Sequence, residues 1–152
     1  MKSNMLAKAI KIASCAHSDQ TDKAGRPYIL HPIRVMQRLR TNDEELMQIA
    51  IMHDLIEDTP ISAGELLELG FSERVMTALD CLTHKEGENY NDYIKRISQN
   101  KDAILVKIED LRDNSDITRL KGLSEKGFKR IEKYNKAFVL LKNSLENLDI
   151  IG

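Results

Sequence analysis

Four polar residues crowd into one short segment, His53-Asp54-Leu55-Ile56-Glu57-Asp58, whose neighbours are mostly apolar. At about 100° of rotation per residue in a helix, the His-Asp pair and the two later acids project into one sector. Burying such charges without partners is costly, so a cation that compensates them is expected. Histidine combined with carboxylate suits Zn, Mn or Fe rather than Ca. A His-Asp pair alone is also typical of a partly exposed helix end. If the pair does bind a metal ion, the remaining ligands must come from other parts of the chain.

Two other positions are candidates for those further ligands. His31 stands at the expected start of a helix in Tyr28-Ile29-Leu30-His31-Pro32, directly after an apolar loop. Asp110 lies in a helical pattern whose apolar stripe runs along another side, and Asn114 follows it one turn later. Periodicity alone favours a solvent-exposed face for 110 and 114, and this alternative stays open.

The elements that must position these side chains are helices. Apolar residues recur at helical spacing along nearly the whole chain, and no stretch alternates as a strand would, which predicts an all-α bundle in one domain over residues 1–152. Asn42, with Glu45 as its capping-box partner, is expected to begin the helix that carries the His-Asp pair. The expected helices are Leu6 to near Gln20, Pro32 to about Leu39, Asn42 to about Asp58, short ones after Ser62 and Ser72, Tyr90–Ile97, Ala103 to about Asn114, and Ser124–Leu148.

Composition narrows the class of protein. The 23 basic and 24 acidic residues give a net charge of −1, which argues against nucleic-acid binding through phosphate contacts. No run approaches the roughly 20 apolar residues of a membrane span. Cys15 and Cys81 lack metal-ligand spacing, so two buried thiols are expected. We therefore expect a cytoplasmic protein, and a local basic pocket for one small anion is compatible with this composition.

Several motifs follow one another along the chain. They are Ala16-His17 with Gln20, Lys23, Gly25 and Pro27-Tyr28-Ile29-Leu30-His31-Pro32, then His53-Asp54-Leu55-Ile56-Glu57-Asp58-Thr59, then Leu82-Thr83 with Lys85, then Val106-Lys107-Ile108-Glu109-Asp110 with Asn114, and more weakly Arg130 and Tyr134. In this order they resemble the HD-domain superfamily of metal-dependent phosphohydrolases, and more narrowly the hydrolase domain of the RelA/SpoT alarmone family. The chain's length resembles that of the small stand-alone hydrolases.

The resemblance implies an HD-domain helical bundle and a role for each matched residue. A divalent metal, usually Mn²⁺ in this family, would be held by His31, His53, Asp54 and Asp110. The acids that would orient or activate the attacking water are Glu57 and Asp58. The nucleotide or its phosphates would be contacted by Lys23, Asn114, Arg130 and Tyr134. The last two also fit an ordinary surface arginine and a half-buried tyrosine. The implied reaction removes the 3′-pyrophosphate of guanosine tetraphosphate or pentaphosphate.

Two departures from the family pattern bear on the substrate. Asp22 replaces a basic residue beside Lys23, and Asp113 and Asp116 stand where the last block is usually basic. We expect these acids to face the approaching polyanion, where a like-charge contact at ~4 Å costs on the order of a few kcal/mol. Arg26 or Arg119 would have to compensate.

Two alternatives to this reaction stay open. One is a phosphohydrolase of another nucleotide, such as a dinucleotide phosphate. The other is a non-catalytic nucleotide-binding HD domain, against which the acidic pair argues because a sensor needs no paired acid beside its metal. The long final helix is compatible with a homo-oligomer as well as with packing on its own bundle.

Overall fold

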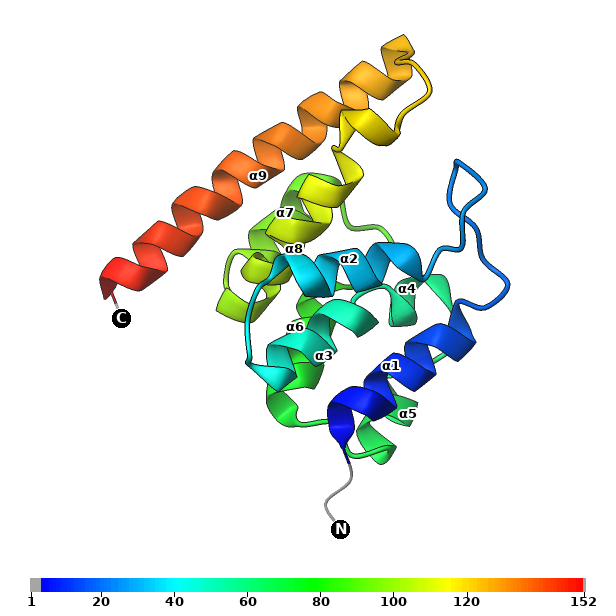
Figure 1. Cartoon of the computed structure of the whole chain (residues 1–152). Coiled ribbons are helices and arrows are strands. Elements are labelled where there is room, and N and C mark those ends of the chain that lie inside the picture. Colours follow the sequence, from blue (N-terminus) through cyan, green and yellow to red (C-terminus); the bar gives the residue numbers. More distant parts are fainter. Residues whose placement is uncertain (1–3, 152) are drawn as a thin grey trace.

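The computed structural model describes residues 4–151, and in this range the chain is all-α, as predicted (Figure 1). Within these residues no strand forms, and Thr21 and Pro27 make one isolated bridge in a loop. The elements are α1 (Met5–Ala16), α2 (Leu30–Arg38), α3 (Glu44–Met52), α4 (Leu55–Asp58), α5 (Ala63–Glu68), α6 (Glu73–Leu82), α7 (Tyr90–Ile97), α8 (Lys101–Asn114), the 3₁₀ turn η1 (Ile117–Arg119) and α9 (Glu125–Ile151).

Helix α3 is the centre of the fold. Its first turn carries the exposed Glu44, and from Gln48 to Met52 every residue is buried, as the mostly apolar composition of this part requires. Helices α1, α2, α6 and α8 pack against it, so the core of the domain surrounds this one helix. Because α3 is followed directly by His53, the most closely surrounded helix of the core leads straight into the His-Asp pair.

The His-Asp pair does not lie inside a continuous helix, so the prediction of one helix from Asn42 to about Asp58 was wrong. Helix α3 ends at Met52, His53 and Asp54 form a turn, and α4 begins at Leu55. The amide of His53 donates to the carbonyl of Ala50, three residues back, which tightens the last turn and ends the helix. The two side chains therefore leave the backbone at a break in the helix rather than along a helix face.

Helix caps explain the other boundaries. Asp43, not Asn42, caps α3, because its carboxylate accepts from the amide of Leu46. Ser62 and Glu65 form a reciprocal capping box at α5, and Ser72 caps α6, as expected from the sequence.

Helix α9 lies across α7 and α8 at one side of the bundle, and Figure 1 shows it running the length of that side. Ala137 and Leu141 are its buried anchors. Val139 and Leu140, between these anchors, are 48% and 42% exposed. Among the described residues no helix is long and apolar enough to cross a membrane. The two thiols are not both buried as predicted, because Cys15 is exposed and Cys81 half-buried.

Candidate metal centre

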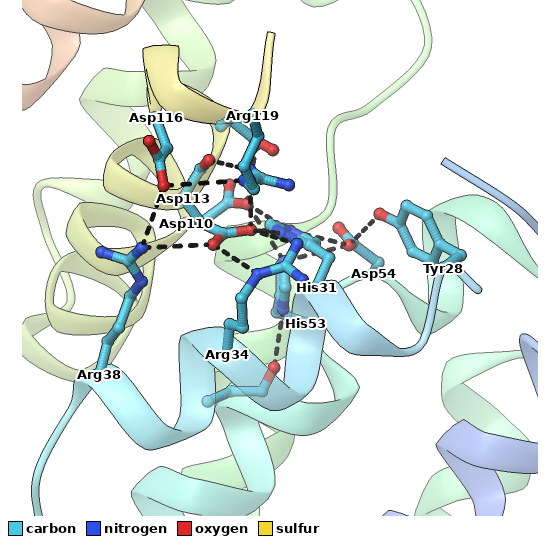
Figure 2. A network of polar contacts seen from close by, with 12 residues as sticks. Tyr28, His31, Arg34, Arg38, His53, Asp54, Asp110, Asp113, Asp116 and Arg119 are labelled. Atoms are coloured by element: carbon cyan, nitrogen blue, oxygen red, sulfur yellow. Dashed lines mark hydrogen bonds and ion pairs between the residues drawn. The ribbon is translucent and has the colours of Figure 1, made fainter. Parts of the chain in front are cut away.

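Four side chains predicted as metal ligands converge in the structure from three separate segments (Figure 2). His31 comes from the first turn of α2, His53 and Asp54 from the break after α3, and Asp110 from α8. The Nε2 atom of His53 lies 3.1 Å from Asp54 Oδ2 and 3.4 Å from Asp110 Oδ1. The Nε2 atom of His31 lies 2.9 Å from Asp110 Oδ1 and 3.7 Å from Asp54 Oδ2. Two imidazoles and two carboxylates thus point at one another.

The opposite nitrogen of each imidazole is already engaged. His53 Nδ1 lies 2.7 Å from the carbonyl oxygen of Ala50, an atom that accepts only, so Nδ1 carries a proton. His31 Nδ1 lies 2.6 Å from Asp113 Oδ2 and is a donor for the same reason. In the neutral imidazoles both Nε2 lone pairs therefore face the carboxylates of Asp54 and Asp110. This is the orientation of metal-ligating histidines, whose second nitrogen is held by a carboxylate or a carbonyl.

The convergence creates a strong local demand for positive charge. Burial by itself would lower the pKa of both histidines, but the neighbouring carboxylates of Asp54 and Asp110 raise the pKa of His53 well above its ordinary value. Burial would likewise raise the pKa of Asp110, yet Lys107 and the two histidines hold it well below its usual range. Carboxylates that stay ionised in the interior need either protonated imidazoles or a cation among them.

A buried nitrogen without a hydrogen-bond partner indicates that these side chains suit a divalent metal ion. The Nε2 atom of His53 is buried and makes no hydrogen bond of acceptable geometry, although two carboxylate oxygens lie near it. Ligand atoms of His31, His53 and Asp54 all lie within 4.8 Å of one another, close enough for one ion to reach all three. The structure thus provides a cluster that could hold a metal ion, with Asp110 beside it.

Other side chains fix the carboxylates of this cluster. The hydroxyl of Tyr28 donates to Asp54 Oδ2 at 2.5 Å, and the ammonium of Lys107 donates to Asp110 Oδ2 at 2.8 Å. The side-chain amide of Asn114 donates to Asp110 Oδ1 at 3.0 Å. Asp110 is therefore buried and turned into the cluster rather than solvent-exposed, whereas Asn114 is exposed and is bound to it.

Asp113 corrects one expectation from the sequence. Its side chain is fully buried and does not face an approaching polyanion. Its carboxylate accepts from His31 at 2.6 Å and from Arg34 at 2.8 and 3.1 Å, and Arg119 Nη2 lies 3.3 Å away. Although burial raises its pKa, these partners hold the pKa of Asp113 far below the ordinary value. Asp113 thus links the candidate metal ligand His31 to two arginines.

The other two acids that departed from the family pattern are bound locally. Asp22 Oδ1 accepts from the amides of Ala24 and Arg26, both at 2.9 Å, which lowers its pKa and closes the loop before α2. Asp116 Oδ1 accepts from the amide and hydroxyl of Thr118 and caps the 3₁₀ turn. Both acids nevertheless line the hollow described below, as expected for acids that face a bound anion, and Asp116 Oδ2 also lies 4.0 Å from Arg38 Nη2.

The predicted catalytic acids follow the metal cluster in α4. The pKa of Asp58 is raised to about 6 by the protein around its carboxyl group and by the charges of Asp54 and Glu57. Glu57 turns toward the loop after α6, where its Oε1 accepts from the amide of His84 at 2.7 Å. The two acids consequently have different surroundings, and the raised pKa of Asp58 lies close to neutral pH.

A hollow of about 640 Å³ adjoins the cluster. The four predicted substrate contacts all line it, together with four further cationic residues, and we call it the basic hollow. The lining side chains used below are Lys23, Arg26, Tyr28, Arg34, Asn114, Arg119, Lys121, Arg130 and Tyr134. Tyr28 and Asn114 belong to its wall and also bind Asp54 and Asp110, so the hollow opens directly beside the candidate metal ligands.

Three of these functional candidates were not found from the sequence. Tyr28 belonged to a matched motif, but nothing in its spacing indicated a hydrogen bond to Asp54. Arg34 lies one turn after His31, a spacing that places both on one side of α2 and was a usable signal. Asp113 was interpreted as a surface acid because its burial depends on α2, which packs over it. Arg26 and Arg119, considered as compensating cations, both line the hollow.

Comparisons with known proteins agree with these observations. The chain is 32% identical over 119 residues to a guanosine-3′,5′-bis(diphosphate) 3′-pyrophosphohydrolase of Aquifex aeolicus, and 33% identical over 122 residues to the bifunctional (p)ppGpp synthase/hydrolase SpoT of Escherichia coli. Each match covers 72% of this chain but only 17% of the relative. The chain therefore spans about a sixth of the length of these relatives. No family model matches the sequence.

A solved structure supports the same grouping at the level of the fold. A metazoan ortholog of SpoT that hydrolyses ppGpp superposes with a TM-score of 0.74, covering 97% of this chain and 94% of that one, at 21% sequence identity. The all-α arrangement described above is thus the fold of an HD domain. In sequence the chain thus resembles these two relatives over 72% of its length, and in fold it matches the SpoT ortholog.

Proposed function

We propose that this protein is a metal-dependent phosphohydrolase that removes the 3′-pyrophosphate of guanosine tetraphosphate or pentaphosphate. The observation that carries the proposal is the position of the basic hollow beside the cluster of His31, His53, Asp54 and Asp110. A phosphate ester bound by the cations of the hollow would place its phosphoryl groups next to the candidate metal ligands. The relatives named as 3′-pyrophosphohydrolases support the choice of substrate.

The four converging side chains would hold the ion. Mixed histidine and carboxylate ligands suit Zn, Mn or Fe, and among these we propose Mn²⁺, the ion that the resemblance implies. When bound, a divalent ion supplies a Lewis acid that polarises a phosphoryl oxygen and acidifies water. Asp113 keeps the His31 ring in the tautomer that presents Nε2, and the carbonyl of Ala50 does the same for His53. Tyr28 holds the Asp54 carboxylate in place.

Other residues of this chain would accept the proton, support the neighbouring loop and bind the phosphates. Asp58, with a pKa of about 6, is deprotonated at neutral pH, and one of its carboxylate oxygens takes a proton from the attacking water. Glu57 braces the loop after α6 through the amide of His84. Arg34 and Arg119 are held beside the cluster by Asp113, where their guanidinium groups bind phosphate oxygens.

The outer part of the hollow binds the rest of the nucleotide. The pKa of Lys23 is lowered first by desolvation and then by the positive charge of Arg130, which lies nearby. Such crowding of cations is relieved when an anion binds between them. Tyr134 lines the same region and offers a ring face for the base. Asn114 lines the hollow and donates a hydrogen bond to Asp110, so it connects the nucleotide side of the hollow with this candidate metal ligand.

The proposal is tested with the purified protein and Mn²⁺ on a panel of substrates. The panel contains guanosine tetraphosphate, reduced dinucleotide phosphates and common nucleoside phosphates, and products are separated by ion exchange. We expect release of pyrophosphate from guanosine tetraphosphate. Turnover of another member only would support the alternative nucleotide hydrolase, and tight binding without any turnover would support the sensor.

Variants separate catalysis from binding. Asp54→Ala is expected to abolish Mn²⁺-dependent turnover, and Asp58→Asn to reduce kcat by about 10²–10⁴-fold with little change in substrate binding. Asp19→Asn changes an exposed acid outside the site and serves as the control. Full activity of Asp54→Ala would refute the assignment of the metal centre.

A further inference from the structure

A second hollow, of about 540 Å³, lies on the outer side of α2 and α8. We call it the outer hollow, and its lining residues are Arg34, Gln37, Arg38, Arg40, Glu109 and Arg112. Four of these six side chains are arginines, and one is an acid. Arg34 is the one residue that lines both hollows. In a chain whose net charge is −1, this is a concentrated positive surface.

The acids near the outer hollow neutralise its arginines only in part, and Asp116 Oδ2 lies 4.0 Å from Arg38 Nη2. Glu109 pairs with Arg112 at 2.7 Å. Asp113 binds Arg34 closely, whereas Arg38 is 3.5 Å from the same carboxylate (Figure 2). That carboxylate also serves His31 and Arg119, so one negative charge is shared among four partners. A surplus of positive charge therefore remains at the rim.

Arg40 adds a second, independent observation. It follows the C-cap residue Leu39 of α2 and has a φ of +47°, the left-handed conformation in which helices usually carry glycine or asparagine. A long side chain in this conformation is strained, and strain of this kind concentrates at functional positions. Arg40 is exposed and makes no ion pair within residues 4–151. Its backbone position nonetheless places it on the outer hollow.

We propose that the outer hollow is a second anion-binding site, for a small molecule with adjacent phosphate groups, of which inorganic pyrophosphate is the simplest. Guanidinium groups recognise phosphate oxygens with two parallel hydrogen bonds, and several around one concavity call for more than one negative charge. The volume of about 540 Å³ lies within the range of small-molecule sites. This proposal does not depend on the hydrolase activity, because it concerns binding outside the basic hollow.

The test measures pyrophosphate binding by calorimetry, with metal-free protein in a buffer without phosphate or sulfate. Arg40→Gly removes one guanidinium and also relieves the left-handed strain. We expect its affinity for pyrophosphate at this site to fall about tenfold, while its melting temperature stays equal or rises. Arg38→Gln, on the other side of the hollow, is expected to weaken binding similarly without relieving strain.

Two controls locate the binding. Lys11→Gln removes an exposed charge on α1 and is expected to bind as wild type does. The double variant Lys23→Gln/Arg130→Gln weakens the basic hollow and is expected to keep the outer site. The proposal is overturned if Arg40→Gly and Arg38→Gln both bind like wild type, if Lys11→Gln loses as much affinity as they do, or if the double variant binds no pyrophosphate.

Discussion

Replacing Asp113 by asparagine tests whether this buried residue positions the metal centre. The carboxylate accepts one hydrogen bond from His31 and two from Arg34, and its side chain is fully buried. An asparagine keeps the shape, but it offers one acceptor oxygen and turns an NH₂ group toward a donor. Hydrogen bonds to charged groups contribute about 1.5–3 kcal/mol each, and Arg34 is partly exposed to water. We expect a loss of unfolding free energy of about 3 kcal/mol.

The functional consequence is separate from this loss of stability. Without Asp113 the His31 ring is no longer held in the tautomer that presents Nε2 to the cluster. Removing a partner of this kind lowers metal affinity by about 10–100-fold. We expect that fall in Mn²⁺ affinity for Asp113→Asn, measured by calorimetry at a temperature where circular dichroism shows the variant to be folded.

Asp116→Asn is the matched control. Asp116 also lies near Arg38 and Arg119, but its carboxylate does not contact His31. It is expected to bind Mn²⁺ as wild type does. A folded Asp113→Asn protein with wild-type Mn²⁺ affinity would show that Asp113 is merely structural and would refute the reasoning.

Three further predictions concern the metal, the core and pH. Removing divalent metal by dialysis against a chelator should lower the melting temperature, and adding Mn²⁺ should raise it again. At a Mn²⁺ concentration of 100 times its Kd, the gain in unfolding free energy should be about 2.7 kcal/mol. No response of the melting temperature to Mn²⁺ would count against the site. Leu141→Ala should cost about 2–5 kcal/mol in urea unfolding, since the side chain is fully buried between α9 and the bundle, whereas exposed Leu140→Ala should change little. Hydrogen bonds from Arg96 lower the pKa of Glu88 from 4.5 to about 2, so the stabilisation is complete above 4.5 and lost as pH falls toward 2. Glu88→Gln should therefore show a weaker dependence of unfolding free energy on pH in that window; an unchanged slope would contradict the pairing.

Much of the fold could be predicted because the signals are local. Helical spacing of apolar residues identified nearly every helix, and Tyr90–Ile97 has the predicted bounds. Caps depend on one side chain and a nearby amide, which is why Ser62 and Ser72 were found. Asn42 was wrong because Asp43, next to it, offers the same capping oxygen, and only the backbone conformation selects between them.

The break between α3 and α4 could not be predicted from periodicity. Leu55 and Ile56 continue the apolar pattern of α3, so the sequence favours an unbroken helix. In the fold, His53 and Asp54 must turn toward His31 and Asp110, which belong to helices packed on the other side. The local helix ends there because its last two polar side chains have partners in the tertiary structure.

The sequence by itself determined the helical class and, through the order of its motifs and their resemblance to a known family, the four candidate metal ligands, since residue type and order are written in it. Only the tertiary structure decided where charge is needed. Packing of α2 against α8 buries Asp113 beneath His31 and Arg34, so an acid that seemed to oppose a polyanion instead aims cations at it. Burial and long-range pairing are properties of the whole fold, and no local pattern encodes them.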